Sequence, residues 1–261
     1  MEKVSLYVKE GSLSKRVSEK LLALLEKNKF VIDDKNPEVV FVIGGDGTFL
    51  RAMHKYLNQL DEISFLGINT GSLGHFCEFS PDELESLVSL LKKGELKATN
   101  HRLLTAEVKG EKETKTIYAL NEIRIQSPFR TLEVKIHVNN IELEDYHGDG
   151  LIASTSLGST GYNKSLGGAI IDPKLDLIEL TGMATIQNNV YRSLGSSIIF
   201  DGDSLIKIEG VFTDSFVAHD YLHFEVNGKV ELLISLSPKE ISILRDSNKT
   251  TMDIMKESFV H

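Results

Sequence analysis

The first hundred residues alternate short, continuous apolar runs with runs whose apolar residues recur at helical spacing. The continuous runs, which predict buried strands, are Val4–Val8, Val39–Ile43 and Ile63–Ile68. The helical runs are expected to begin at the caps Ser12, Thr48 and Ser80. Ser80 is followed by Pro81 and Glu83, the residue types of a capping box. Strands that alternate with helices predict a parallel sheet covered by helices.

From about residue 101 the pattern changes to short alternating runs. These runs, which predict antiparallel strands, cover residues 117–125, 132–138, 141–143, 151–153, 198–200, 204–208 and 223–226. Asn139 and Asn140 are expected to form a tight turn, and residues 172–186 are expected to hold one helix. The chain is therefore predicted to have an α/β domain over residues 1–100 and a β-rich domain over residues 101–244. The tail, residues 245–261, is expected to pack back on the first domain.

Composition limits the classes to which the chain can belong. Its 261 residues carry a net charge of −9, which argues against a general nucleic-acid binder because counterion release needs clustered Lys and Arg. No apolar run approaches the roughly 20 residues that span a bilayer, and residues 1–4 lack the layout of a signal peptide. Cys77 is the one cysteine, which fits a reducing compartment. We therefore expect a cytoplasmic protein that binds neither nucleic acid nor a membrane.

A glycine-rich turn, residues 44–48, follows the second predicted strand and carries Asp46 at its centre. Its glycines let the backbone approach a ligand closely, and a helix that starts there offers N–H groups to phosphate. A loop that only held phosphate would not favour a carboxylate, so Asp46 indicates chemistry on a hydroxyl, or metal binding, beside a phosphate. The spacing matches neither a P-loop nor a Rossmann fingerprint. The alternative is an ordinary strand-to-helix turn with a solvated Asp.

A second polar cluster lies at residues 154–163, after the sequence Gly148-Asp149-Gly150. A strand end rich in hydroxyls and glycine suits several hydrogen bonds to a sugar or a phosphate, and Tyr162 is placed to stack on a base. The pair Asn121-Glu122 also follows an apolar run. A solvated loop and an ordinary turn are the alternatives at these two places.

Three carboxylates, those of Asp46, Glu122 and Asp149, are each predicted to lie at a strand end or a turn. Gathered in one cleft, they would bind ribose hydroxyls or help to hold Mg²⁺. His219 and His223 have the spacing of a zinc-binding helix motif. Their neighbours predict a strand, which would place the two rings roughly 13 Å apart, so no zinc site is expected there.

Taken together, Gly-Gly-Asp-Gly-Thr at 44–48, Leu-Asn-Glu at 120–122 and the block at 148–169 resemble the motifs of bacterial NAD kinases. The order and spacing match over roughly residues 40–200, and the block at 148–169 is the most specific part. The resemblance implies an α/β N-terminal domain, a β-sandwich-like C-terminal domain that binds NAD, and a homotetramer. It also implies transfer of a phosphoryl group from ATP, or from polyphosphate, to the 2′-hydroxyl of the adenosine ribose of NAD, with Mg²⁺ or another divalent cation accompanying ATP.

The same resemblance assigns roles to individual residues. Asp46 would activate the 2′-hydroxyl. Asn121 and Glu122 would hold the ribose or nicotinamide side of NAD, and Asp149 would line the same pocket from a neighbouring subunit. The other residues implied to bind the nucleotides are Gly45, Gly47, Thr48, Gly74, His75, Ser154, Thr160, Gly161, Tyr162 and Ile186.

Four residues depart from the family pattern. Leu157 replaces a hydroxyl residue, His147 replaces a usual Arg, and Gly161 replaces a usual Ala. His75 stands in place of an aromatic residue, where it is set either to hydrogen-bond a ligand or only to line the pocket. The changes at Leu157 and His147 favour one alternative, a non-catalytic nucleotide-binding protein that keeps the fold. The glycine motif alone leaves a second alternative, a lipid or sugar kinase.

Overall fold

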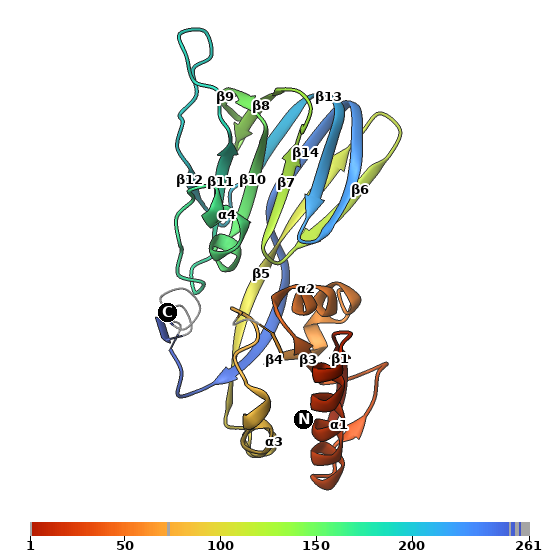
Figure 1. Ribbon diagram of the computed structural model, residues 1–261. Coiled ribbons are helices and arrows are strands. Elements are labelled where there is room, and N and C mark those ends of the chain that lie inside the picture. Colours follow the sequence, from red (N-terminus) through yellow and green to blue (C-terminus); the bar gives the residue numbers. More distant parts are fainter. Residues whose placement is uncertain (1, 72–73, 251, 254–255, 257–261) are drawn as a thin grey trace. The chain divides into compact units, whose positions relative to one another are not determined.

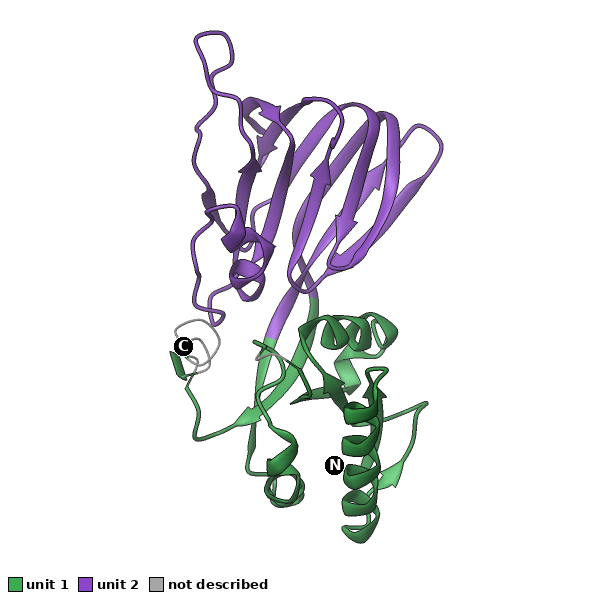
Figure 2. Cartoon of the chain, in the orientation of Figure 1, with its two compact units in different colours: residues 1–100, 239–261 green, residues 101–238 purple. Residues whose placement is uncertain are grey.

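The computed structural model describes residues 2–71, 74–250, 252–253 and 256, and it divides the chain into two compact units. Unit 1 consists of residues 1–100 and 239–261, and unit 2 consists of residues 101–238 (Figure 2). The C-terminal segment 239–250 therefore belongs with the start of the chain. Most of the tail beyond it, for which packing was expected, lies outside the described residues.

Unit 1 is built on a parallel sheet with helices, as the alternating pattern predicts (Figure 1). The strands are β1 (Lys3–Val8), β2 (Val31–Ile32), β3 (Val39–Gly44), β4 (Ser64–Asn69) and the end of β14 (Leu222–Asp246). They pair in the order β2-β1-β3-β4-β14, and each pair is parallel. The helices are α1 (Ser12–Lys27), α2 (Asp46–Lys55) and α3 (Leu84–Lys93), with short 3₁₀ turns at Leu60–Glu62 and Pro81–Glu83.

The helix starts correct two of the predicted caps. Helix α2 begins at Asp46 with Gly45 as its N-cap, so Thr48 lies inside the helix. Helix α1 likewise begins at Ser12 itself, because Gly11 with φ of 142° provides the sharp entry that other residues rarely adopt. The capping box at Ser80 and Glu83 is confirmed: the Ser80 side chain accepts from the backbone at Glu83, and the Glu83 side chain accepts from the Ser80 N–H.

Unit 2 is formed mainly of antiparallel strands, as expected. They are β5 (Leu96–Lys109), β6 (Thr114–Ala119), β7 (Glu122–Gln126), β8 (Leu132–Val138), β9 (Ile141–Gly148), β10 (Gly150–Thr155), β11 (Leu177–Met183), β12 (Ile198–Asp201), β13 (Ile206–His219) and most of β14. The main path is β12-β11-β10-β7-β13-β14; off this path, β8 pairs with β13 and β9, and β5 pairs with β14 and β6. The only helical pieces among the described residues of this unit are the 3₁₀ turn Leu157–Thr160 and the one-turn α4 (Tyr162–Ser165).

Three local predictions in unit 2 need correction. The helix expected over 172–186 is instead strand β11, because Ile178 and Leu180 are needed in the sheet core. The run at 117–125 is two strands, which a turn at Leu120–Asn121 separates. His219 and His223 lie on two strands of one hairpin rather than on one strand, with His219 opposite Leu222. The tight turn at Asn139 and Asn140 is confirmed, and both residues have positive φ.

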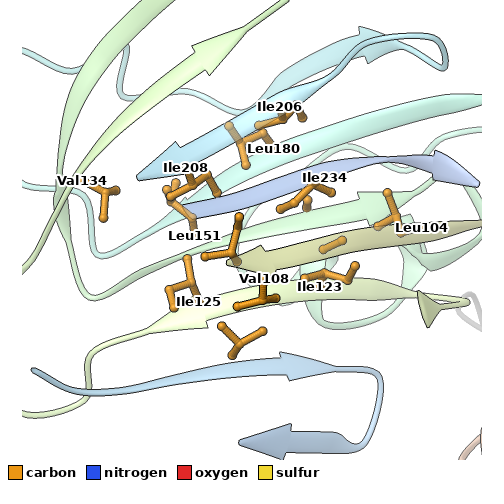
Figure 3. Packing of buried hydrophobic residues seen from close by; sticks show 14 of the residues in the cluster. Leu104, Val108, Ile123, Ile125, Val134, Leu151, Leu180, Ile206, Ile208 and Ile234 are labelled. Atoms are coloured by element: carbon orange, nitrogen blue, oxygen red, sulfur yellow. The ribbon is translucent and has the colours of Figure 1, made fainter. Parts of the chain in front are cut away.

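Each unit has its own hydrophobic core. The core of unit 1 combines the apolar face of α1 with side chains from β1, β3, β4 and α3. The core of unit 2 gathers alternate residues of the antiparallel strands, and Figure 3 shows side chains such as Ile125, Leu151 and Ile208 pointing toward one another. Within the described part of the chain, no helix has the length and apolar character that crossing a membrane requires.

Replacing Leu21 with Ala tests the packing of α1. Leu21 is fully buried in the core of unit 1, whereas Leu13 on the same helix is 44% exposed. A buried Leu→Ala change usually costs about 2–5 kcal/mol because it removes apolar contacts and leaves a cavity. We expect Leu21→Ala to lower the free energy of unfolding by that amount in urea titrations and Leu13→Ala to change it by less than about 1 kcal/mol. Equal effects at both positions would contradict the packing described.

Candidate active site

The glycine-rich turn connects β3 directly to the first turn of α2. The Gly45 carbonyl accepts from the N–H groups of Thr48 and Phe49, at 2.8 and 3.1 Å, and so closes the start of the helix. Asp46 is the first helical residue rather than the centre of a loop. Gly44 packs against Thr48, since a Cβ on Gly44 would lie 2.3 Å from the Thr48 hydroxyl. The first N–H groups of any helix lack intrahelical partners, so this turn can bind an anion.

Backbone N–H groups from the segment after β4 hold the Asp46 carboxylate. One carboxylate oxygen, Oδ2, accepts from the His75 N–H at 2.8 Å, and Oδ1 accepts from the Phe76 N–H at 2.9 Å. A carboxylate has about four acceptor positions, so each oxygen can accept one more hydrogen bond. Asp46 is therefore fixed in orientation and still has acceptor positions for a ligand.

The approach of this segment to Asp46 depends on two close backbone contacts. A Cβ on Gly74 would lie 2.3 Å from Asp46 Oδ1, and a Cβ on Gly67 would lie 2.4 Å from the Phe76 carbonyl. Neither distance is compatible with a side chain at those positions. Phe79 extends the contact by pairing with the end of β4, where its carbonyl accepts from the Asn69 N–H at 2.7 Å. Two glycines thus allow the segment to lie against β4 and reach Asp46.

His75 contributes to this arrangement through its backbone. Its side chain is only 5% exposed, and the ring meets the Phe76 ring edge-on, with centroids 5.9 Å apart. The suggested contact between the imidazole and a ligand stays a prediction.

In unit 2, Asp220 holds the Asn121-Glu122 turn, although no sequence pattern singled it out as a site residue. The Asp220 carboxylate accepts from the N–H groups of Leu120 and Asn121 at 3.0 and 2.8 Å. The Asp220 N–H donates to the Glu122 carbonyl at 3.1 Å. Asp220 lies at the tip of the β13–β14 hairpin with φ of 51°, a conformation that Asp tolerates better than most residues.

The hydroxyl-rich segment after β10 packs against the same turn. The Thr155 hydroxyl donates to the Leu120 carbonyl at 2.7 Å and accepts from the Gly158 N–H at 2.8 Å. Gly158 lies so close that a Cβ there would meet the Asn121 carbonyl at 2.1 Å. Gly161 faces both members of the pair, since its Cβ position is 3.6 Å from Glu122 Oε2 and 3.8 Å from Asn121 Nδ2. The structure therefore brings Asn121, Glu122 and Gly161 together.

The Glu122 carboxyl group is buried, with 7% of the residue exposed. Burial, followed by the negative charge of Asp220, raises its pKa to about 7, while the positive charge of Arg124 acts in the opposite direction. Oxygen Oε2 of Glu122 has no hydrogen-bond partner among the described residues. A buried oxygen without a partner is costly, and a ligand hydroxyl at this place would provide one.

The Tyr162 ring lies beside this group and is 37% exposed. The Arg124 guanidinium stands over it, 5.2 Å from the ring centroid. The other face of a ring held in this way can stack on a flat ligand. By contrast, three nearby side chains are buried among other residues of this chain, namely those of Ser154, Thr155 and Leu157.

Asp149 and Ile186 lie at the other end of β10. Glu122 pairs with Ser154, whereas Gln126 pairs with Gly150, so Asp149, one residue before Gly150, is separated from Glu122 by about 17 Å of strand. Asp149 is exposed, and the Ile186 N–H donates to the His147 carbonyl at 2.8 Å. The expectation that Glu122 and Asp149 share one cleft is therefore wrong within a single chain. An antiparallel register places the two ends of a strand apart.

The arrangement matches a known family over both units. The family model of the ATP-NAD kinase N-terminal domain matches residues 12–96, and that of the C-terminal domain matches residues 120–245. The chain belongs to the NAD kinase family. NAD kinase 1 of Listeria monocytogenes serovar 1/2a is 42% identical over 217 residues, which are 82% of each chain. An NAD kinase of Streptococcus pneumoniae is 42% identical over 199 residues, 76% of this chain and 73% of the relative.

Solved NAD kinase structures share the fold. A yeast NADH kinase complexed with NADH superposes with a TM-score of 0.87 at 18% identity and covers 98% of this chain and 86% of its own. An NAD kinase from Archaeoglobus fulgidus in complex with ATP gives a TM-score of 0.77 at 22% identity and covers 98% of each chain. The predicted family and the predicted two-part fold are confirmed.

The described residues include no cluster of three or more His, Cys, Asp or Glu side chains that could hold a metal ion. Each of the two candidate sites is built around carboxylates. The first contains Asp46, and the second contains Glu122 and Asp220.

The buried Glu122 carboxyl should make stability depend on pH. Its pKa rises from 4.5 to about 7 on folding, so the native state keeps a proton that the unfolded chain releases in this window. The stabilisation is complete below pH about 4.5 and is lost as the pH rises through about 7, by up to about 3 kcal/mol. We expect Glu122→Gln to reduce this loss when urea unfolding is compared at pH 5 and pH 8.

The control is Glu225→Gln, which changes an exposed acid on β14. If the pH dependence of Glu122→Gln matches that of this control, Glu122 is not the buried acid that we describe.

Proposed function

We propose that the protein transfers the γ-phosphoryl group of ATP to the 2′-hydroxyl of the adenosine ribose of NAD and so forms NADP. The observation that carries the proposal is the Asp46 carboxylate at the first turn of α2, which the backbone N–H groups of His75 and Phe76 fix while acceptor positions remain available. The family match over both units supports the choice of NAD as the acceptor. The names of the relatives support it as well.

Asp46 is proposed to accept the proton of the 2′-hydroxyl. As the 2′-oxygen forms its bond to the γ-phosphorus, its proton passes to Asp46, and the bond between the γ-phosphorus and the bridging oxygen of ADP breaks. A hydroxyl is a weak nucleophile at neutral pH, and a well-placed base typically accelerates such a step by 10²–10⁴-fold. Most of the remaining stabilisation comes from positioning and from N–H groups aimed at the phosphate, for which the first turn of α2 and Gly45 and Gly47 are suited.

Mg²⁺ is proposed to accompany ATP. In nucleotide complexes Mg²⁺ usually binds the phosphates and keeps several waters, with only one or two protein carboxylates. When bound, the ion neutralises phosphate charge.

Asn121 and Glu122 are proposed to bind the ribose of NAD. The free acceptor position of Glu122 Oε2 suits a hydroxyl donor, and the Asn121 amide beside it can both donate and accept. Tyr162 is proposed to stack on a base of the dinucleotide. Asp149, exposed at the far end of β10, is proposed to complete the NAD site of a neighbouring subunit in a homotetramer. We infer a cytoplasmic location from the single cysteine.

One assay decides the acceptor and the phosphoryl donor. The protein is incubated with ATP or polyphosphate, each against NAD and NADH, with Mg²⁺ present, and NADP or NADPH is quantified. A lipid and a sugar panel run in parallel tests the other kinase classes. Tight NAD binding with no turnover under any donor would show a non-catalytic nucleotide-binding protein instead.

Replacing Asp46 with Ala tests the proposed base. We expect Asp46→Ala to lower kcat by about 10²–10⁴-fold while the dissociation constant for NAD, measured by calorimetry, changes little. A variant with near-normal kcat would exclude this role for Asp46.

Replacing Gly74 with Ala tests whether the position of the Asp46 carboxylate matters. The new Cβ would lie 2.3 Å from Asp46 Oδ1 and must displace it. A misplacement of about 1 Å in a catalytic group can cost roughly 10²-fold in rate, so we expect a fall in kcat of that order. The matched control is Gly71→Ala, where the nearest atom lies 4.0 Å away. If both variants retain full activity, the close contact at Gly74 has no catalytic importance.

A further inference from the structure

Strand β11 carries a carboxylate between two apolar residues. Glu179 lies between Ile178 and Leu180, is 0% exposed, and forms no ion pair with any residue that the structure describes. Burying a carboxylate away from water is expensive unless hydrogen bonds compensate. A carboxylate buried at this position therefore needs specific hydrogen-bond donors.

Those partners all come from the segment just after Tyr162. Glu179 Oε2 accepts from Asn163 Nδ2 at 2.7 Å, and Glu179 Oε1 accepts from the Ala169 N–H at 2.7 Å. Asn163 Oδ1 accepts in turn from the Thr181 hydroxyl at 2.8 Å, and the Thr181 and Ser197 hydroxyls lie 2.8 Å apart. Both carboxylate oxygens and both polar atoms of the amide are therefore used.

The segment also closes on itself around Asn163, which is fully buried. The Asn163 carbonyl accepts from the N–H groups of Leu166 and Gly168, at 3.1 and 3.0 Å. A Cβ on Gly168 would lie 2.2 Å from Asn163 Nδ2, so only glycine fits against the amide. Because α4 has only four residues, it cannot be stable by its own hydrogen bonds. Its position depends on this anchor.

We propose that Glu179 and Asn163 are positioning residues, which hold the segment 160–162 in place for the nucleotide. The proposal rests on the proposed function. Neither residue need touch the substrate, because Asn163 follows Tyr162 directly and Glu179 holds it from β11. Asn163 donates the hydrogen bond between the two side chains and Glu179 accepts it. This direction can be tested, because Asp is nearly the same shape as Asn, and Gln is nearly the same shape as Glu.

The Asn163→Asp variant should disrupt the anchor. It places two groups that only accept hydrogen bonds at 2.7 Å from each other. We expect the KM for NAD to rise about 10-fold at pH 8.5, with kcat within about 2-fold of the wild type. A contact made equally in the ground state and the transition state affects KM rather than kcat. At lower pH two adjacent carboxyl groups can share one proton, so the KM should recover toward that of the wild type near pH 6.

The Glu179→Gln variant is the matched control, and its addition to Asn163→Asp is the rescue. With Glu179→Gln alone, the Asn163 amide can rotate by 180° and keep every hydrogen bond, because the Thr181 hydroxyl can also accept. In the double variant, the introduced amide donates to the introduced carboxylate and still accepts from the Ala169 N–H. We expect the KM of both proteins to stay within about 2-fold of the wild type at pH 6 and at pH 8.5.

Other titratable or charged groups near the pair must not produce the pH effect. Glu144 and Tyr146 line the adjoining cavity of about 470 Å³ together with Glu179, and Lys164 lies on α4. All three are present in every variant, so the comparison of each variant with the wild type at the same pH removes their contribution.

Hydrogen–deuterium exchange of residues 157–169 provides a measurement that needs no substrate. We expect faster exchange in Asn163→Asp at pH 8.5 and a return to the wild-type pattern in the double variant. If the double variant exchanges as fast as Asn163→Asp, or if Asn163→Asp exchanges like the wild type, the anchor is wrong. If exchange follows the prediction but the KM for NAD does not, the pair is structural only and the positioning role is overturned. A wild-type protein that phosphorylates no NAD would overturn the proposed function, while the exchange pattern would still decide the anchor.

Discussion

The Asp46 carboxylate can be fixed only because two pieces of backbone approach each other without side chains between them. Strands β3 and β4 lie side by side, with Gly44 opposite Asn69, so the turn after one strand and the segment after the other start from neighbouring places. Gly74 then allows the backbone at His75 and Phe76 to donate to the carboxylate. The strand order of the parallel sheet and the glycines beside it thus determine where the Asp46 carboxylate lies. The chemistry proposed for Asp46 depends on that position.

Unit 2 uses buried carboxylates in a comparable way. Asp220 holds the Asn121-Glu122 turn by accepting from two backbone N–H groups, and Glu179 holds the segment after Tyr162 through Asn163 and the Ala169 N–H. Each costs desolvation energy that an apolar residue would not. In return, each fixes the geometry of an irregular segment, whose backbone groups no regular sheet or helix would satisfy.

Sequence patterns predicted the regular elements of unit 1 well and several details of unit 2 less well. Continuous apolar runs gave β1, β3 and β4, and the capping box at Ser80 was found because its residue types and spacing are local. The stretch 172–186 was wrongly predicted as a helix because a short apolar run suits either a helix or a strand until its partners are known. Thr48 was wrongly predicted as a cap because α2 begins two residues earlier, at Asp46, with Gly45 in the N-cap position.

The sequence alone determined the family, the two-part fold and the identity of Asp46, Asn121 and Glu122 as candidate residues, because these depend on local spacing and on motifs that stay contiguous along the chain. Only the tertiary structure decided what holds them. The N–H groups that orient Asp46 lie 29 and 30 residues away, and Asp220 lies about a hundred residues from the turn that it supports. It also decided that Glu122 and Asp149 lie at opposite ends of one strand pair. Contacts between residues so distant along the chain arise from strand pairing and close packing, which no local pattern encodes.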